Sequence, residues 1–268
     1  MATPTPTSTS TPTSAPVPLP LNTGVESQGQ EQLEEAIAQY DEAIRLDPQN
    51  AEAYNNRGYA YDNLGQPQRA IEDYDEAIRL DPQNAEAYNN RGNAYTELGQ
   101  LQRAIQDLDE AIRLDPQYTA AYNSRGSVYG ILGQFQRALQ DFDEVIRLDP
   151  QDADAYNNRG NAYTDLGQPQ RAIEDYDEAI KLDPQDAVAY NNRGSVYIDL
   201  GQPQLAIDDY DEVIRLDPQD ALAYANRARA NTLLSRDTEA QQDIAHAVEL
   251  GFDRETLEVE IERVKSER

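Results

Sequence analysis

The stretch Ala51 to Asn84, AEAYNNRGYAYDNLGQPQRAIEDYDEAIRLDPQN, decides the fold because nearly the same text returns along the chain. Residues 153–186, ADAYNNRGNAYTDLGQPQRAIEDYDEAIKLDPQD, differ from it at only six positions. The full units of 34 residues begin at Ala51, Ala85, Thr119, Ala153 and Ala187. A degenerate sixth unit begins at Ala221. A short unit cannot bury its apolar face alone, so five copies in phase predict a solenoid of stacked units.

Each unit contains the pattern of two helices. Tyr54, Gly58 and Tyr61 lie at helical spacing, and Gly65 follows them as a C-terminal stop, which predicts a first or A helix. Pro67 then stands where a helix can begin. The second or B helix is predicted from apolar residues at spacings of three and four before the Asp-Pro step, namely Ala70, Ile71, Tyr74, Ala77 and Ile78.

Capping residues agree with this period. An Asn or Asp side chain can accept a hydrogen bond from the free N–H groups of a first helical turn. Such residues precede the successive A helices at Asn50, Asn84, Asp152, Asp186 and Asp220. Tyr118 interrupts the series, and we expect Thr119 to cap that helix instead.

The unit resembles the tetratricopeptide repeat over about Leu33 to Leu250. The family's pattern of large, small and aromatic residues is met here by Tyr54, Gly58, Tyr61, Ala70, Tyr74, Ala77 and Pro82. The resemblance implies an all-α fold, a right-handed superhelical solenoid of antiparallel helix pairs with A helices on the concave side. We therefore expect a tail over 1–25, a half-repeat over 26–50, full repeats over 51–220, a degenerate repeat over 221–252 and a terminal helix over 253–268.

The two ends of the array depart from the repeat. In the half-repeat only a B-type helix is expected, and we predict that the segment Val17 to Val25 or another molecule covers it. Beyond the sixth unit, Leu257, Ile261 and Val264 form one apolar stripe among charged residues. This pattern predicts a helix that closes the C-terminal end.

Charge and composition restrict the partners. Acidic residues outnumber basic ones 50 to 22, for a net charge of −28. Such a field repels nucleic acid and anionic lipid and favours basic or neutral partners. No apolar run is long enough to span a membrane, so direct insertion is not expected. Residues 1–20 consist largely of Thr, Ser and Pro, which fits either a flexible tail or a surface linker of an extracytoplasmic or trimmed anchored protein.

Catalytic patterns are missing from the sequence. There is no cysteine, one histidine and no glycine loop for phosphates. His246 stands where other units carry a Glu, such as Glu76 and Glu178, on the polar face of the last B helix, which favours a surface histidine. Paired acids such as Asp75 and Glu76 lack the spacing of a calcium loop. The sequence therefore predicts no enzyme activity, no metal and no cofactor.

Arginine and aspartate recur together. Arginine occupies one place in every A helix: Arg57, Arg91, Arg125, Arg159, Arg193 and Arg227. Aspartate occupies one place in every B helix: Asp73, Asp107, Asp141, Asp175, Asp209 and Asp243. The half-repeat without an A helix has Gln39 at the aspartate position. This coincidence predicts structural ion pairs within or between units, with the guanidinium groups unavailable to a ligand.

Polar ladders mark the expected binding face. One runs through Asn55, Asn89, Asn123, Asn157 and Asn191, and a second through Asn56, Asn90, Asn158, Asn192 and Asn226. Carboxamides can pair with the main chain of an extended peptide whatever its sequence. A scaffold role is an equal alternative for the second ladder, whereas ligand binding is favoured for the first. The varied residues on this face are expected to set specificity: Tyr59, Asp62, Glu97, Asp165, Ile198 and Leu222.

These features favour a protein interaction scaffold that binds an extended basic or neutral peptide along its concave groove. A structural or surface spacer that self-associates is the alternative. Some members of the family clamp acidic chaperone tails with A-helix cations, at positions that here hold Glu52, Asn55 and Asn56. Because those cations are missing, we predict no binding of acidic tails. The sequence does not give the oligomeric state.

Overall fold

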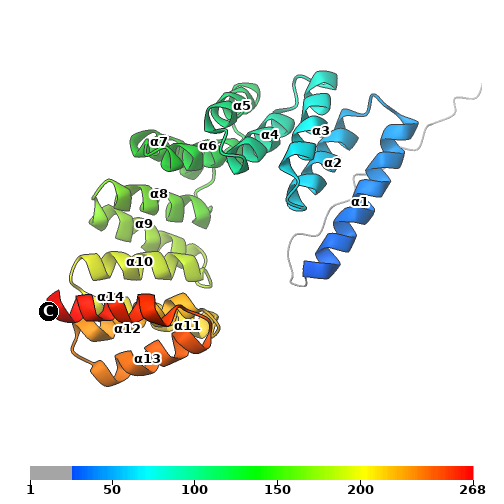
Figure 1. The fold of residues 1–268 in the computed structure, drawn as a ribbon. Coiled ribbons are helices and arrows are strands. Elements are labelled where there is room, and N and C mark those ends of the chain that lie inside the picture. Colours follow the sequence, from blue (N-terminus) through cyan, green and yellow to red (C-terminus); the bar gives the residue numbers. More distant parts are fainter. Residues whose placement is uncertain (1–25, 268) are drawn as a thin grey trace, which may run out of the picture.

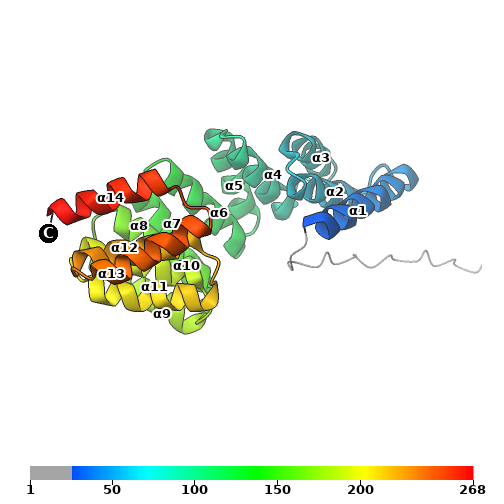
Figure 2. The ribbon, with the colours of Figure 1, turned by 60° about the horizontal axis from the view of Figure 1, so that its bottom comes forward.

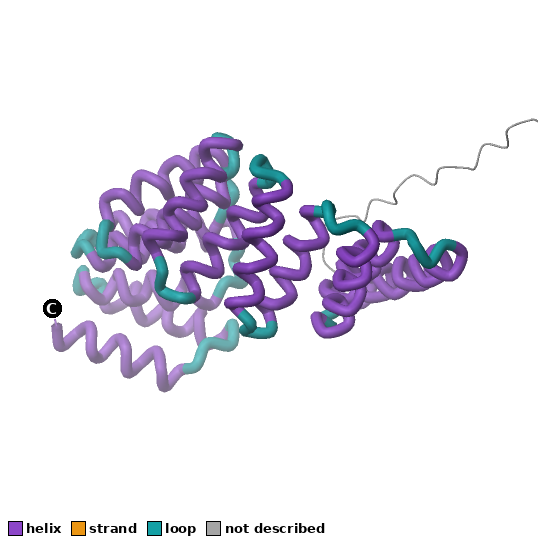
Figure 3. Tube along the Cα trace, turned by 90° about the horizontal axis from the view of Figure 1, so that it is seen from above, coloured by secondary structure: helices purple, strands orange, loops and turns teal. Residues whose placement is uncertain are grey.

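The computed structural model describes residues 26–267, and in that range the chain forms fourteen α-helices and no strand. Short loops join the helices (Figure 3). The A helices are α2 (Ala51–Asn63), α4 (Ala85–Glu97), α6 (Thr119–Ile131), α8 (Ala153–Asp165), α10 (Ala187–Asp199) and α12 (Ala221–Leu233). The B helices are α3 (Pro67–Leu80), α5 (Leu101–Leu114), α7 (Phe135–Leu148), α9 (Pro169–Leu182), α11 (Pro203–Leu216) and α13 (Asp237–Glu249). The expected all-α solenoid of helix pairs is confirmed.

Helix starts follow the predicted caps, with one exception. Each predicted Asn or Asp cap accepts a hydrogen bond from the backbone N–H three residues later, as Asn50 does from Ala53 at 3.0 Å. The expectation for Thr119 is wrong, because Thr119 is already the first helical residue of α6. Tyr118 holds the cap position, and its side chain makes no capping hydrogen bond.

Close approach of the two helices explains the conserved spacing of glycine and aromatic residues within each unit. A Cβ added to Gly58 would lie 2.8 Å from Cε1 of Tyr74, so the buried ring requires glycine opposite it. In the sixth unit the pair becomes Ala228 and Ile244, both buried. In this last unit a smaller residue than tyrosine on the B helix therefore faces a larger residue than glycine on the A helix.

The array is curved, with the A helices on its inner side. Each A helix from α2 to α10 contacts the A helix of the following unit, whereas no B helix of the described residues contacts the next B helix. The A helices are therefore closer together, and the B helices fan outward. In Figure 1 the chain runs from α1 at the right, over α4 to α7, down to α12 to α14 at the lower left, which traces this arc.

The C-terminal helix α14 (Arg254–Glu267) closes one end of the array. It packs mainly on α12 and also touches α13 (Figure 2). Leu257, Ile261 and Val264 are all nearly fully buried there, and Leu257 and Ile261 join a core cluster with Ala225 and Ile244. The apolar stripe of this helix thus covers an end that would otherwise be exposed to water.

The opposite end is formed by α1 (Glu26–Leu46), a B-type helix that packs on α2. Tyr40 is half-buried here, whereas its equivalent Tyr74 is fully buried, because no A helix precedes α1 in the described part of the chain. The predicted tail over 1–25 and the proposed cover by Val17 to Val25 lie outside the described residues.

Candidate functional site

The inner surface of the arc is the candidate site. We call it the A-helix face: the side of α2, α4, α6, α8 and α10 that is turned away from the B helices. Part of α12 is covered, because α14 buries Ala225 and brings Glu260 to 3.8 Å from Arg229. The open part of the face therefore spans five A helices.

The recurring arginines are held by the fold. Arg57 donates two hydrogen bonds to Asp73 of its own unit, at 2.8 Å and 2.6 Å, and a third to Asp41 of the preceding B helix, at 2.5 Å. The same three bonds recur in every later unit, up to those of Arg227 with Asp243 and Asp211. The prediction of structural pairs, within and between units, is confirmed.

Because these ion pairs are buried, they fix the positions of the two helices that they join. The carboxylate of Asp73 is buried, and its hydrogen bonds raise the pKa of Arg57. Burial raises the pKa of Asp141, although Arg125 pulls it down. The Arg57 guanidinium also lies over the rings of Tyr54 and Tyr61, 5.6 Å and 6.0 Å from their centroids. Because the Arg57 guanidinium already donates to two carboxylates and lies over two tyrosine rings, this arginine has a structural role.

The two asparagine ladders form one network between units. The oxygens of four of the five first-ladder residues, all but Asn89, accept a hydrogen bond from the second-ladder amide of the next unit. The pairs are Asn90 to Asn55 at 3.3 Å, Asn158 to Asn123 at 3.0 Å, Asn192 to Asn157 at 3.1 Å and Asn226 to Asn191 at 3.0 Å. Asn55 also donates to Glu86 at 3.2 Å. Three first-ladder residues, Asn55, Asn89 and Asn157, are buried, so these amides connect neighbouring units.

One rung of the network is incomplete. Asn89 is 4 % exposed, and its Oδ1 atom is buried without a hydrogen-bond partner. Ser124 stands where the other units place the donating asparagine. A buried acceptor left unpaired costs about 1–3 kcal/mol. We therefore expect the junction between the second and third full units to be weaker than its neighbours.

Replacing Ser124 by Asn is expected to supply the missing donor and to stabilise the protein by about 1 kcal/mol. The matched control is Asn90→Ser, which removes the donor to the buried oxygen of Asn55 and should destabilise it by a similar amount. Urea unfolding followed by circular dichroism measures both. A Ser124→Asn variant no more stable than the parent would show that Asn89 is satisfied in another way.

Asp62 is the most perturbed group on the A-helix face. Its side chain is half-buried, and its Oδ1 atom has no hydrogen-bond partner. Burial, followed by the charge of exposed Glu97, raises the pKa of Asp62 to about 7. The hydroxyl of Tyr74 is also buried without a partner. The site thus holds acidic and polar groups that the protein itself does not satisfy.

The unpaired Tyr74 hydroxyl results from one exchange between units. In the fourth unit the equivalent Tyr176 donates to Asn161 at 2.7 Å. Tyr59 takes the place of that asparagine in the first unit, and its ring is 36 % exposed. The sequence shows that Tyr59 replaces an asparagine, but only the structure shows that this asparagine would accept the hydrogen bond of the Tyr74 hydroxyl.

The raised pKa of Asp62 predicts a pH-dependent contribution to stability. A carboxyl whose folded pKa lies above its unfolded value of about 4 stabilises the fold in acid and loses that contribution as the pH rises toward 7. We expect Asp62→Asn to be more stable than the parent at pH ~8, by about 1–2 kcal/mol after solvent screening, and similar at pH ~5. Urea unfolding at both pH values tests this, and an equal difference at both would contradict it.

The two apolar residues that were predicted to contact a ligand, Ile198 and Leu222, differ in exposure. Ile198 was expected on the binding wall, which is wrong: it is 7 % exposed and packs with Ala206, Ile207 and Tyr210. At the equivalent position Thr96 donates a hydrogen bond to the backbone carbonyl of Gly92 in its own helix. Ile198 has no polar group that could make such a bond, and its side chain packs into the core instead. Leu222 is 49 % exposed, as a ligand-contacting residue must be.

The remaining acids of the face are free of cations. Glu97 and Asp165 are exposed, and no lysine or arginine of the described residues forms an ion pair with either. By contrast, B-helix acids such as Glu76 pair with an arginine three residues later. The inner surface therefore carries negative charge that no cation of the described residues compensates.

His246 is exposed on α13, where its ring stacks on Tyr224 with centroids 5.3 Å apart. No group of three or more His, Asp or Glu side chains between residues 26 and 267 is arranged to hold a metal ion. No helix in this range has the length and apolar character needed to cross a membrane.

Comparison with protein families assigns the fold. A model described as tetratricopeptide repeat matches residues 153–186 and 187–220, and one described as TPR repeat matches 30–65 and 126–167. A third, also described as tetratricopeptide repeat, matches 56–119. Together they cover well over half of the chain. The chain belongs to the tetratricopeptide repeat family.

Solved tetratricopeptide repeat proteins resemble this one over most of their length. MamA from Desulfovibrio magneticus, solved from residue 41 to its end, is 26% identical with a TM-score of 0.57, over 63% of this chain and 96% of the solved chain. YrrB, described as having an unusual peptide-binding site, is 25% identical with a TM-score of 0.54, over 69% and 95%. A protein from Parabacteroides merdae, 22% identical with a TM-score of 0.65 over 88% and 99%, shares the fold. No curated protein matches the sequence.

The tetratricopeptide fold and these neighbours support a protein interaction scaffold. Tetratricopeptide repeat proteins are in general non-catalytic scaffolds. The free side chains described above lie on the A-helix face, whereas the arginines are bound within the framework.

Proposed function

We propose that the A-helix face binds an extended peptide segment of basic or neutral character. The observation that carries this proposal is the state of Asp62, a half-buried carboxyl without a hydrogen-bond partner beside the exposed acid Glu97. A lysine or arginine of the partner would pair with both acids and offset the desolvation of Asp62. The peptide-binding site described for YrrB supports a peptide as the ligand.

Other exposed residues on or near the A-helix face offer further contacts to the peptide. Tyr59 offers a partly exposed ring close to Asp62. Leu222, on α12 next to the A-helix face, offers an exposed apolar surface. We propose Asp165 as a further acidic contact. The two asparagine ladders hold neighbouring A helices together and form a rigid wall of the groove. Their amide hydrogens that are not used between units can donate to the main chain of the peptide.

The test is a screen of a randomised peptide library for binding to the full chain, followed by affinity measurements on two variants. Asp62→Asn with Glu97→Gln removes two charges from the A-helix face. Glu72→Gln with Glu174→Gln removes two charges from exposed positions on B helices and serves as the matched control. We expect basic peptides to lose about tenfold in affinity on the first variant only, and to bind more weakly as salt is added.

Binding should also depend on pH in a defined direction. A cation beside Asp62 favours its ionised form, so binding releases a proton from a group with a pKa of about 7. Affinity is therefore expected to rise between pH ~6 and ~8 for the parent and to be flat for Asp62→Asn. Equal losses in the two double variants would contradict the assigned face. A chain that binds no peptide but self-associates in sedimentation would support the spacer alternative.

A further inference from the structure

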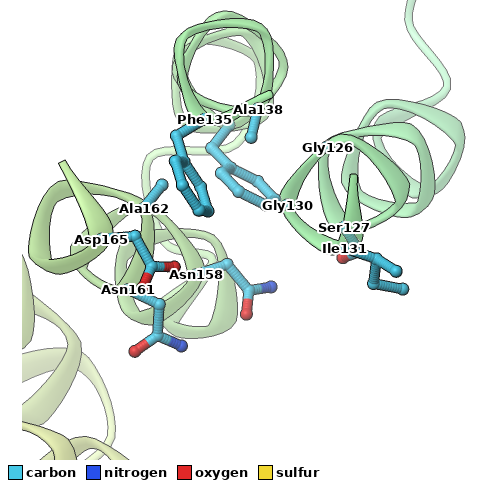
Figure 4. Close-up of a pocket in the computed structure, with 11 residues that line it drawn as sticks. Gly126, Ser127, Gly130, Ile131, Phe135, Ala138, Asn158, Asn161, Ala162 and Asp165 are labelled. Carbon is cyan, nitrogen blue, oxygen red and sulfur yellow. The ribbon is translucent and has the colours of Figure 1, made fainter. Parts of the chain in front are cut away.

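A small pocket opens on the A-helix face where α6, α7 and α8 meet. Its volume is about 140 Å³. Phe135 and Ala138 of α7 line it from one side, Gly130 and Ile131 of α6 from a second, and Asp165 of α8 from a third (Figure 4). A cavity of about 150 Å³ is large enough for a benzene-sized group. The pocket therefore accommodates one apolar side chain.

Two residues make this junction different from the others. Gly130 stands where the other A helices carry a side chain: Asp62, Thr96, Thr164, Ile198 and Thr232. A Cβ added to Gly130 would meet no atom within 4 Å, so this space is open. Phe135 stands where three other B helices begin with proline. The absence of one side chain and the presence of an aromatic ring together create an apolar pocket.

The rim of the pocket combines apolar and acidic groups. Ile131 is 64 % exposed, which is costly for a large aliphatic side chain unless a partner covers it. Asp165 is exposed and has no cation partner among the described residues. Asn161 uses its oxygen to accept from Tyr176, which leaves its amide hydrogens to donate. The rim thus offers an apolar contact, a hydrogen-bond donor and a carboxylate.

We infer that this pocket receives one apolar side chain, of leucine, isoleucine, methionine or phenylalanine size, from a peptide that carries a lysine or arginine beside it. The apolar side chain packs on Phe135 and Ile131, the neighbouring cation pairs with Asp165, and Asn161 donates to a peptide carbonyl. This inference rests on the proposed function and adds an anchoring position to it.

The test fills the pocket with a residue that the fold already uses at this place. Thr96 and Thr164 occupy equivalent positions and bond back to the carbonyls of Gly92 and Gly160, so Gly130→Thr is expected to fold normally. Thermal unfolding checks this. Gln136→Thr, at an exposed position of α7, introduces the same residue outside the pocket and is the control.

Peptides from a randomised library are selected on the parent protein, and each is remeasured on both variants. We expect the selected peptides to share an apolar residue next to a basic one and to lose about tenfold or more in affinity on Gly130→Thr, with no change on Gln136→Thr. Replacing the apolar residue of the peptide by serine should weaken binding to the parent but hardly to Gly130→Thr. Asp165→Asn should reduce binding only of the peptides that carry the cation.

The outcomes separate this inference from the proposed function. Peptides that bind the parent and Gly130→Thr equally, yet lose affinity on Asp62→Asn with Glu97→Gln, would overturn the pocket and leave the proposed function intact. A library from which no peptide binds the A-helix face would overturn both.

Discussion

Replacing Arg125 by Gln is expected to destabilise the protein by about 3–5 kcal/mol at neutral pH, because it leaves the buried carboxylate of Asp141 without its cation. The variant also loses the bond to Asp109 of the preceding unit. Glutamine retains much of the volume of the side chain but neither the charge nor the forked geometry. Urea unfolding, with hydrogen exchange in α6 and α7, measures the effect.

The pH dependence of this variant provides an internal check. Burial already raises the pKa of Asp141 in the parent, and removal of the cation should raise it further. A group with a raised folded pKa destabilises the fold when it ionises, so the deficit of Arg125→Gln should shrink as the pH falls. The control is Arg147→Gln, which breaks the exposed pair with Glu144 and should cost below about 1 kcal/mol. Equal losses for Arg125 and Arg147 would refute a structural ladder.

Replacing Ile261 by Ala in α14 is expected to cost about 2–5 kcal/mol, concentrated in the last unit. Ile261 is 2 % exposed and packs with Ala225, Ile244 and Leu257. In a solenoid each unit is stabilised by its neighbours only, so the loss of the cap should loosen α12 and α13 first.

Hydrogen exchange resolved by helix is the appropriate measurement, because repeat arrays depart from two-state unfolding. We expect protection to fall in α12 to α14 and to persist in α2 to α9. Val259→Ala is the control, since Val259 lies on the same helix but is 66 % exposed. A uniform loss of protection along the chain would show that the array unfolds as one unit.

Much of the framework could be predicted from the sequence because its contacts repeat with the period. The joint occurrence of Arg57 and Asp73, with Gln39 where the A helix is missing, was sufficient to predict their pairing. The caps were predictable for the same reason, since their hydrogen bonds are local. Thr119 failed as a cap because helical periodicity fixes the first residue of a helix only to within one or two positions.

The binding face was harder to predict, because it depends on how neighbouring units approach one another. The sequence placed the two asparagine ladders side by side but did not show that Asn90 donates to Asn55, which lies 35 residues earlier. It also did not show which way Ile198 turns. Periodicity assigns a residue to a helix face, and the contact with the next unit then decides whether the side chain is buried.

The bonds between units also make the array modular. Each unit presents a guanidinium to the carboxylate of the unit before it, as Arg91 does to Asp75, and an amide oxygen to the unit after it, as Asn157 does to Asn192. Except at the junction where Ser124 replaces the donor to Asn89, the donors and acceptors of one junction therefore match those of the next. A gene that gains or loses a whole 34-residue unit would still encode matching junctions, so the length of this protein can change by duplication without new interface residues being required.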